Sequence, residues 1–587
     1  MSLSRQQVFW LLLIVCMATL LPFLGLFDFH TKGEPREAIV AYSMLESGNW
    51  ILPTNTGGEI PYKPPFFHWL IAGASWLFGG YVTEYTSRLP SALALIVMTV
   101  WTFDFVARRR GNGEGLCTAL VLLTAFEIHR AGLNCRVDMV LTMLTVGAIY
   151  CFYGWWEKGM KGISWGATLM MSLATLTKGP VGMIVPCLAT GVFLLMERVN
   201  FFKALWKIAL AGLLSLVLPL LWYWAAYQQG GKEFLDLVME ENFGRMTSTM
   251  DYDSCVHPWP YNIMTLTVGM IPWTLFVILG LFGLLRRAKT VGIPGRVDSL
   301  SIRNTGNRSI LTLAAVVSVV IFVFYCIPQS KRSVYLMPMY PFVAYLTVRF
   351  VRYIGRRAAS IPHIFAWFIA VLAILVPAVF VALKCGLIPE SVVGHGRHAA
   401  QNLAMMQAVA SCGKWWQWIL VMIPAAASLF WILAGDRRCG PLDSIGWSAA
   451  MIMAIYVSVD GVYQPAVLNT KSQKDVASAI AAVVPPGKGV LYEYIQLGET
   501  AKGDPVHYFE LNFYLGDRVA RFVKDRPAEG YLITGDEDME ANRPLFESWG
   551  YSFTPVLDTH RSIGRQNTRV WRFEKAGKAA QTSSSEP

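Results

Sequence analysis

Long uninterrupted blocks of apolar residues restrict the fold of this chain more than any other feature. A helix needs roughly 20 apolar residues to cross the hydrocarbon core of a bilayer, and the 587-residue chain contains many such blocks. Charged residues make up only 15% of it, against roughly 25% in soluble proteins. The sequence therefore predicts a polytopic α-helical membrane protein with about thirteen spanning segments. They centre on residues 8–27, 88–107, 114–130, 137–156, 162–177, 180–196, 204–227, 262–285, 309–327, 335–351, 362–384, 415–434 and 445–464.

Basic residues concentrate in the short connections between alternate apolar blocks. The positive-inside rule assigns such loops to the cytoplasm, which puts the N-terminus inside and, with an odd number of spans, the C-terminal tail outside. These loops explain the net charge of +11 without nucleic-acid binding. The first block begins near Val8 and lacks a small-residue cleavage site, so we expect a retained anchor rather than a signal peptide. The basic loops contain Arg108–Arg110, Lys158, Lys161, Arg198, Lys203, Arg286–Arg308, Arg349–Arg357, Arg437 and Arg438.

Composition divides the chain near residue 466. Residues 1–466 hold the apolar blocks and an outer loop, 28–87, in which Phe66–Gly80 is too short for a comfortable span and is expected to lie at the membrane interface. Residues 467–587 have an ordinary, charged composition and indicate a small soluble α/β domain. Its predicted strands are Gly489–Glu493, Gly530–Thr534 and Val570–Phe573, and its predicted helices are Asp475–Val484 and Asn542–Trp549.

The ten cysteines show no spacing typical of a zinc site. Those inside apolar blocks are expected to be small packing residues. Cys385 and Cys412 fall in one outer loop, where they are either a disulfide, if the compartment is oxidising, or two free thiols.

Charged side chains gather in the loops assigned to the outer face. The first outer loop contributes Glu34, Arg36 and Lys63, and the prolines that follow Lys63 stiffen its backbone. Cations outnumber carboxylates on this face, where the insertion rule disfavours them, so an anionic ligand is expected. Guanidinium and ammonium groups both suit phosphate oxygens, which favours a lipid-linked phosphate arriving from the bilayer. The other outer-face candidates are Arg136, Asp138, Lys178, Arg245, His257, Lys331, Arg332 and Tyr335.

Several of these residues also have a purely structural explanation. Arg136 and Asp138 could form a local ion pair at a helix start, and Lys178 could extend toward lipid headgroups. His257 could be an ordinary loop residue. The structural explanation is weaker for the charges of the first outer loop, because they cluster with proline, glycine and aromatic residues.

Six short motifs follow one another over the first part of the chain. Their order and spacing resemble the aminoarabinose lipid A transferase family, membrane glycosyltransferases of the GT-C type that are related to protein O-mannosyltransferases. The resemblance covers roughly residues 1–350, and Ser330-Lys331-Arg332 with Tyr335 looks like a later motif of the same family. The six motifs are Gly33-Glu-Pro-Arg36, Ser47-Gly-Asn-Trp50, Tyr62-Lys-Pro-Pro65, Arg88-Leu-Pro-Ser91, Arg136-Val-Asp138 and Leu176-Thr-Lys-Gly179.

The resemblance implies a sugar transferase that uses a polyprenyl-phosphate-linked monosaccharide at the outer face of a bacterial inner membrane, with the C-terminal domain in the periplasm. It implies that Lys63 contacts the donor phosphate, with Arg245 and Tyr335 as helpers. Arg36 and Lys331 are expected to add positive charge to the same site. The expected partners are the donor, a lipid or glycan acceptor and membrane lipids, with no nucleic acid and a monomeric chain.

Two positions depart from the family pattern. Gly33 stands where the family carries the aspartate most often assigned to catalysis, so only Glu34 remains of its first acidic pair. The expected catalytic carboxylates are therefore Glu34 and Asp138, unless the acceptor is an already ionised phosphate that needs no base. Tyr62 replaces a glutamate of a proposed metal site, so no metal is predicted despite His257.

The leading hypothesis is an inverting transfer from a polyprenyl phosphate to an outer-leaflet or periplasmic acceptor, which could be a lipid A-like glycolipid, another glycan or a protein. The alternative is a transporter or flippase of an anionic lipid-linked substrate, which internal repeats and interrupted helices would favour. The sequence shows no repeat, and its charges gather on one face. A scaffold whose outer tail binds a partner is a third hypothesis.

Overall fold

The chain forms two compact units in a computed structural model that describes residues 3–61, 63–241, 256–291, 305–396, 398–435, 440–496, 505–563 and 566–575. The helical unit comprises Met1–Phe27, Tyr62–Ala74 and Thr83–Thr470. The mixed unit comprises Asp28–Pro61, Ser75–Val82 and Lys471–Pro587. Most of the first outer loop thus groups with the C-terminal region.

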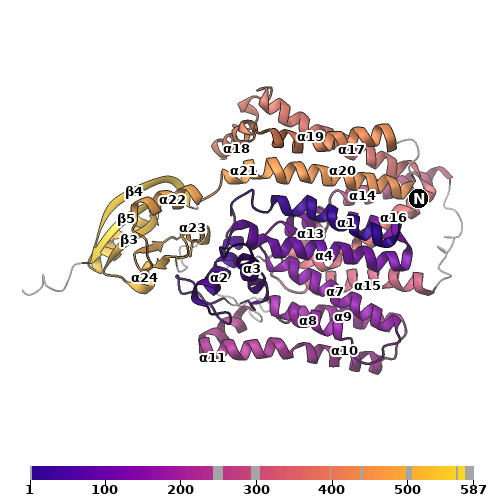
Figure 1. Cartoon of the computed structure of the whole chain (residues 1–587), viewed down its shortest axis with the longest axis horizontal. Helices are drawn as coiled ribbons and strands as arrows, with labels where there is room; N and C mark the ends of the chain where they lie inside the picture. The colour runs from indigo at the N-terminus through magenta and orange to yellow at the C-terminus, as the bar shows by residue number, and fades with distance from the viewer. Residues whose placement is uncertain are drawn as a thin grey trace, which may run out of the picture. The chain divides into compact units, whose positions relative to one another are not determined.

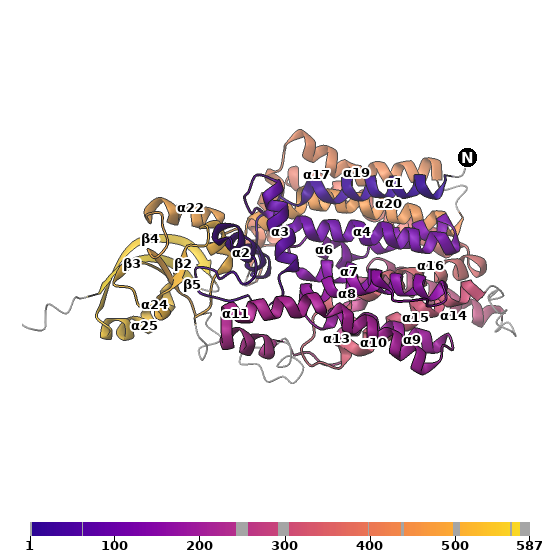
Figure 2. The ribbon, with the colours of Figure 1, turned by 60° about the horizontal axis from the view of Figure 1, so that its bottom comes forward.

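Helices make up nearly all of the described helical unit (Figure 1). Helix α1 runs alongside α4 and α20 (Figure 2) and packs against both. The helices are α1 Arg5–Leu20, α4 Glu84–Arg110, α5 Asn112–Leu123, α6 Phe126–Gly132, α7 Val137–Glu157, α8 Trp165–Lys178, α9 Val181–Met196, α10 Phe201–Ser215, α11 Val217–Met239, α13 Tyr261–Gly269, α14 Trp273–Val291, α15 Thr305–Cys326, the 3₁₀ helix η3 Ser333–Met339, α16 Tyr340–Arg357, α17 Ser360–Lys384, α18 Ala399–Ser411, α19 Trp415–Phe430, α20 Pro441–Ser458 and α21 Gln464–Asn469. Helix α3, Phe66–Leu77, begins in this unit.

The structure confirms a polytopic helical membrane protein, but with fewer full-length spans than the thirteen expected. In the described part of the chain, nine helices are long and apolar enough to cross a membrane, or ten if α13 and α14, which meet at a 99° bend, count as one span. Segment 114–130 is interrupted after α5 at Thr124. Segments 162–177 and 180–196 form the 14-residue α8 and the 16-residue α9. An apolar run in the sequence does not reveal where its helix breaks.

Two glycines in the hairpin of α8 and α9 fix the position of the C-terminal end of α8. Gly179 ends α8 with a φ of +85°, which a residue with a side chain rarely adopts. At Gly182 an added Cβ would collide with the backbone of Ala174 and Thr175. The absence of a side chain at this position therefore lets the two helices approach closely and fixes the position of the last turn of α8.

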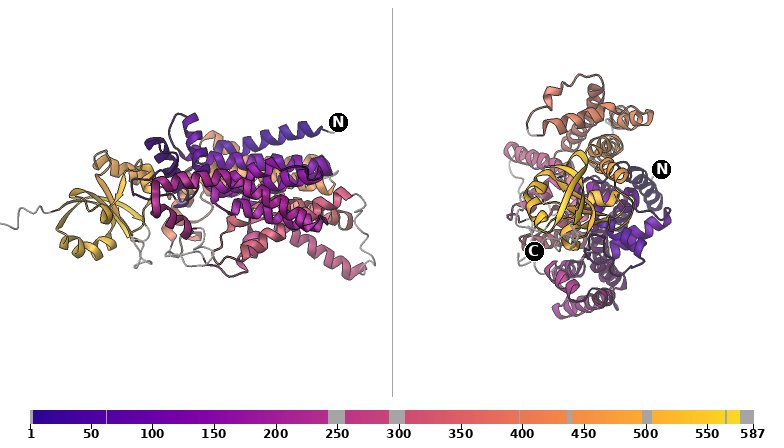
Figure 3. Two further views of the ribbon diagram at one scale, coloured as in Figure 1. Left: turned by 90° about the horizontal axis from the view of Figure 1, so that it is seen from below. Right: turned by 90° about the vertical axis from the view of Figure 1, so that its left-hand side faces the viewer.

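The mixed unit contains a five-stranded sheet of order β2-β1-β3-β5-β4 (Figure 3). β1 pairs parallel with β2 and β3, whereas β5 pairs antiparallel with β3 and β4. The three predicted strands correspond to β1, β3 and β5, so the expected small α/β fold is confirmed. The elements are α2 Gly33–Ser47, α22 Lys474–Val483, β1 Leu491–Tyr494, α23 Phe509–Tyr514, β2 Val519–Arg521, α24 Phe522–Asp525, β3 Glu529–Gly535, α25 Asp536–Ser548, β4 Tyr551–Ile563 and β5 Gln566–Lys575.

A buried polar network inside the mixed unit joins the first outer loop to the C-terminal region. The Asp517 carboxylate accepts hydrogen bonds from Ser43 Oγ of α2 at 3.3 Å and from the Thr56 backbone N–H at 3.1 Å. It also accepts one from Asn512 Nδ2 of α23 at 2.8 Å. Burial raises the pKa of Asp517, and these donors hold its oxygens in place.

His507 lies in the same network and contacts the Glu493 carboxylate through Nδ1. Its Nε2 accepts a hydrogen bond from Asn512 Nδ2 at 2.9 Å. Burial by itself lowers the pKa of His507, but the charge and hydrogen bond of Glu493 outweigh burial and raise the pKa above its ordinary value of 6.5.

All the described cysteines are free. Cys385 follows α17 and Cys412 follows α18, and neither forms a disulfide. The sequence left a disulfide or two free thiols open for this pair, and the structure has two free thiols.

Candidate functional site

An ion pair at the N-terminal end of α7 forms the centre of the site. Asp138 lies in the first turn of α7, and Lys178 lies in the last turn of α8. Each charge therefore sits at the helix end where the helix dipole favours it. The Lys178 ammonium donates directly to Asp138 Oδ1. The two side chains are only 19% and 11% exposed, so Lys178 does not extend toward lipid headgroups.

Two more cations surround this pair. Lys63 and Arg136 both lie close enough to Asp138 for their charges to act on its carboxylate. The Arg136 carbonyl accepts a hydrogen bond from Ser91 Oγ at 3.2 Å, which fixes the start of α7. Three cations thus lie within electrostatic range of one carboxylate.

The aromatic ring of Tyr335 covers one side of the pair. Lys178 Nζ lies 4.5 Å from the centre of this ring, a distance typical of a cation–π contact. Tyr325 of α15 lies behind it, with ring centres 5.4 Å apart, and lies within electrostatic range of Asp138. Two tyrosine rings, one from α15 and one from η3, thus lie beside the cationic group.

Glu127 of α6 holds this segment in place. Its Oε1 accepts a hydrogen bond from Ser333 Oγ at 2.9 Å, two residues before Tyr335. Arg130 donates to both oxygens of Glu127, at 2.8 and 3.1 Å, and balances its charge. The sequence analysis did not identify Glu127 and Arg130, although charged residues inside the apolar segment 114–130 were the available signal.

Lys331 and His257 form a second, separate contact. Lys331 Nζ donates to the His257 carbonyl at 2.9 Å, and the His257 N–H donates to the Gln329 carbonyl at 3.3 Å. The His257 ring stacks on Tyr261 with centres 4.0 Å apart. These bonds join the segment before α13 to the segment before η3.

The Arg88-Leu-Pro-Ser91 motif has a structural role in this unit. Arg88 is fully buried and donates to the carbonyls of Leu24 and Phe27 at 2.8 and 2.7 Å, with its guanidinium over the Phe27 ring. Ser91 reaches the start of α7, as described above. The motif therefore joins α4 to the segment that follows α1 and to the start of α7, all within the helical unit.

Glu34 and Arg36 belong to the mixed unit. Glu34 is buried in the first turn of α2, where a carboxylate favours the helix N-terminus. Arg36 forms an ion pair with Glu37 at 3.0 Å. Arg245 lies outside the described residues. Among the residues that are described, no group of three or more His, Cys, Asp or Glu side chains could hold a metal ion.

Residues 62–224, which contain the charged group around Asp138, match the family model described as dolichyl-phosphate-mannose-protein mannosyltransferase. Over these residues the chain is similar to that family of glycosyltransferases. An undecaprenyl phosphate-α-4-amino-4-deoxy-L-arabinose arabinosyl transferase from Edwardsiella ictaluri is 26% identical over 54% of this chain. The chain spans 55% of that relative's length.

Two further similarities extend over more of the chain. An uncharacterised protein of Aquifex aeolicus is 25% identical over 64% of this chain and 71% of its own length. The fold is similar to the crystal structure of ArnT from Cupriavidus metallidurans bound to undecaprenyl phosphate, with a TM-score of 0.68 and 20% identity, over 97% of this chain and 98% of that chain. The resemblance predicted from the ordered motifs is thus confirmed, and the similarity in fold covers nearly the whole chain.

Proposed function

We propose that the protein transfers a monosaccharide from a polyprenyl-phosphate donor to an acceptor at the outer face of the membrane. The observation that carries this proposal is the group in which Lys63, Arg136 and Lys178 surround Asp138. Its ammonium and guanidinium groups match a phosphate group, which such groups bind well. Two similar proteins support this class of donor: the undecaprenyl phosphate-α-4-amino-4-deoxy-L-arabinose arabinosyl transferase of Edwardsiella ictaluri, and the Cupriavidus metallidurans ArnT structure bound to undecaprenyl phosphate.

In the proposed reaction the bond between the anomeric carbon and the phosphate oxygen of the lipid breaks. Its electron pair leaves with the lipid phosphate, and the surrounding cations stabilise the charge that develops there. The acceptor oxygen bonds to the anomeric carbon from the opposite face, which inverts its configuration. A hydroxyl acceptor gives its proton to a base, whereas an ionised phosphate acceptor needs none.

We assign Asp138 to positioning rather than to proton transfer. The Asp138 carboxylate already accepts from the Lys178 ammonium, with Lys63 and Arg136 within electrostatic range. Its oxygen is therefore engaged by Lys178 rather than open to an acceptor proton. Its contact with Lys178 fixes the ammonium in one direction, which favours binding of the donor phosphate. Tyr335, whose ring lies against the same ammonium, offers a hydroxyl to a phosphate oxygen.

We also propose that the mixed unit holds Glu34 and Arg36 in their working conformation. Both residues lie in the first turn of α2, whose Ser43 donates to Asp517 from the C-terminal region. In the last turn of α2, Glu46 pairs with Lys488 at 2.7 Å. The C-terminal half of α2 is thus anchored by the C-terminal part of the same unit.

Helix α7 supports the assignment of the charged group to the outer side. Its 21 residues give a length of about 30 Å, close to the thickness of the hydrocarbon core. Asp138 lies at one end, and Glu157, which pairs with Arg109 at 2.6 Å, lies at the other. Since Arg109 belongs to a basic loop assigned to the cytoplasm, we place Asp138 on the periplasmic side of a bacterial inner membrane.

The test is transfer by purified protein from radiolabelled undecaprenyl-phosphate-linked aminoarabinose to an envelope extract. Lys63→Ala should lower turnover about 10- to 100-fold, the factor for a lost hydrogen bond to a charged group. The matched control is Lys207→Ala, whose ammonium donates to the Gly162 carbonyl at 3.3 Å and which should leave turnover unchanged. Full turnover of Lys63→Ala would remove Lys63 from the mechanism.

The same donor distinguishes the transporter hypothesis. In sealed vesicles containing the protein and no acceptor, a transferase leaves the labelled lipid on its original leaflet and intact. Movement of intact donor across the bilayer, with no labelled product when acceptor is supplied, would contradict the transferase hypothesis and support the flippase hypothesis.

A further inference from the structure

A buried carboxylate at the opposite end of the helical unit is surrounded by arginines. Glu114, in the first turn of α5, is only 2% exposed. Arg110, at the end of α4, donates from Nε to Glu114 Oε2 at 3.0 Å. From α16, Arg349 donates to Glu114 Oε1 at 3.1 Å, and Arg352 contacts the same oxygen. Three helices therefore meet around a single negative charge.

The positive charge of this group is far from balanced. Arg356 also acts electrostatically on Arg349 and Arg352. Among the described residues, the three arginines that contact Glu114 thus have a fourth cation near them and one carboxylate between them. Uncompensated charge in a partly buried setting is costly, which favours binding of an anion. The side chains of Arg349 and Arg352 are 23% and 37% exposed, so an anion can reach them.

Neighbouring arginines of α4 do not share this excess. Arg108 pairs with Asp104 at 2.7 Å, and Arg109 pairs with Glu157 at 2.6 Å. The unbalanced charge is thus local to the arginines around Glu114 and is not a general property of this end of the helices.

A buried hydroxyl beside the arginines points to the same ligand. Tyr345, one helical turn before Arg349, is 2% exposed, and its hydroxyl has no hydrogen-bond partner within the described residues. The charges of Arg110 and Arg349 both act on this hydroxyl. A buried donor without a partner costs free energy, and an anion oxygen held by these arginines would accept its hydrogen bond.

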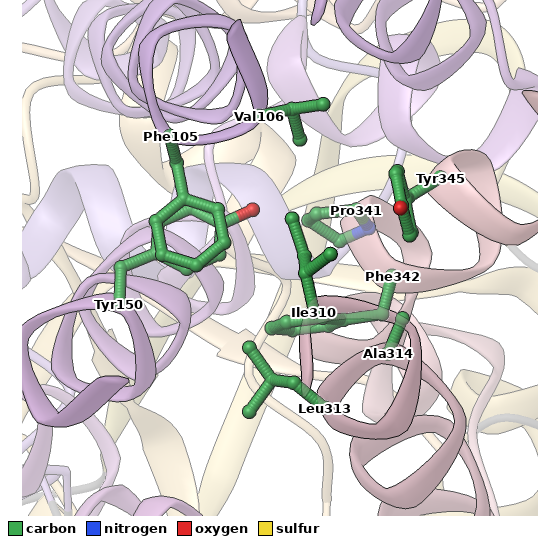
Figure 4. A pocket seen from close by; sticks show the side chains of 9 residues that line it. All are labelled: Phe105, Val106, Tyr150, Ile310, Leu313, Ala314, Pro341, Phe342 and Tyr345. Atoms are coloured by element: carbon green, nitrogen blue, oxygen red, sulfur yellow. The ribbon is translucent and has the colours of Figure 1, made fainter. Parts of the chain in front are cut away.

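Tyr345 also lines a narrow crevice between α4, α7, α15 and α16, walled by apolar and aromatic side chains (Figure 4). The rings of Phe105 and Tyr150 stack there with centres 4.0 Å apart. Ile310 and Leu313 of α15 form part of the same wall. Apolar surroundings next to a cationic group suit an amphiphile better than a fully hydrated ion.

We propose that the Glu114 arginine group and Tyr345 together bind the phosphate of an anionic phospholipid headgroup. The guanidinium forks of Arg349 and Arg352 contact its oxygens, and the Tyr345 hydroxyl donates to one of them. Basic pockets between helices at the cytoplasmic surface are where anionic headgroups bind, and this end of the unit carries the loops assigned to the cytoplasm. The site is independent of the proposed glycosyl transfer.

The test measures retention of phosphatidylglycerol by purified protein, using native mass spectrometry after reconstitution in phosphatidylcholine with and without phosphatidylglycerol. In the double variant Arg349→Gln/Arg352→Gln the amount of retained phosphatidylglycerol should fall by a factor of about ten or more. Tyr345→Phe, which keeps the ring and the fold, should retain it about two- to tenfold less. Lys203→Gln, a basic position exposed at the start of α10, is the matched control and should retain it as the wild type does.

Wild-type retention by Tyr345→Phe and by the double variant would overturn the site. An equal loss in Lys203→Gln would also overturn it, because binding would then depend on general charge. Release of phosphatidylglycerol by inorganic phosphate, with equal stabilisation of the protein by that ion alone, would support the phosphate contacts but overturn a lipid as the ligand.

Discussion

Replacing Asp138 by Asn, Lys178 by Met, and both together would test whether the carboxylate acts through the lysine. The two side chains are in direct contact and are only 11% and 19% exposed, so water screens the pair little. A hydrogen bond to a charged group contributes about 1.5–3 kcal/mol, or about 10- to 100-fold in rate. We expect each single variant to lower kcat/KM by such a factor. The double variant should lose no more than Lys178→Met alone.

The size of the combined effect separates positioning from general-base catalysis. A general base contributes roughly 10²–10⁴-fold, and a base that acts independently of Lys178 would make the two losses multiply. The assay is radiolabel transfer from undecaprenyl-phosphate-linked aminoarabinose at limiting and saturating donor, with each purified variant. A double variant whose loss equals the product of the two single losses would refute the assignment of Asp138 to positioning.

The Arg109–Glu157 pair at the other end of α7 provides the matched control. Its atoms lie 2.6 Å apart, so it resembles the Asp138–Lys178 pair in kind. Arg109→Gln and Glu157→Gln should lower the melting temperature without changing kcat/KM. A comparable loss of transfer in these variants would mean that the assay reports stability rather than the site.

Three further predictions concern the units separately. His507 has a raised pKa in the folded protein, so its charged form stabilises the fold. The stability that His507→Gln loses relative to wild type should therefore be largest below about pH 6.5 and should shrink as pH rises through the higher folded pKa. Thermal melts across this pH range measure the difference. Asp517→Asn should speed hydrogen exchange of residues 33–47 about tenfold or more and lower kcat more than donor binding, whereas Asp558→Asn on β4 should do neither. Gly182→Ala should destabilise the protein by about 1–3 kcal/mol, because its Cβ would meet the α8 backbone. Gly154→Ala, where an added Cβ meets nothing within 4 Å, should leave the melting temperature unchanged.

The membrane architecture and the small α/β region could be predicted from the sequence because both depend on local patterns. Apolar runs revealed the helices, and alternating runs revealed β1, β3 and β5. The short strand β2 and the bulged β4 carry weaker patterns, and their pairing partners lie elsewhere in the chain. Helix breaks such as the one at Thr124 depend on packing against neighbours, so the number of spans came out too high.

The candidate site could be predicted only in part. The sequence identified Lys63, Asp138 and Lys178 as outer-face charges, but it offered Arg136 as the local partner of Asp138. In the structure Asp138 contacts Lys178, forty residues away in the sequence. The first outer loop looked like one cluster of charges, whereas the compact units divide it after Pro61.

The sequence by itself determined that this chain enters a membrane, which of its loops are basic, and which family it resembles. These properties follow from sums over neighbouring residues, because insertion depends on the hydropathy and charge of continuous segments. Only the tertiary structure decided which charges meet, such as Lys178 with Asp138 or three arginines with Glu114. Contacts of this kind depend on how helices distant in the sequence pack, and that packing is set by side-chain shape along whole helices rather than by any local motif.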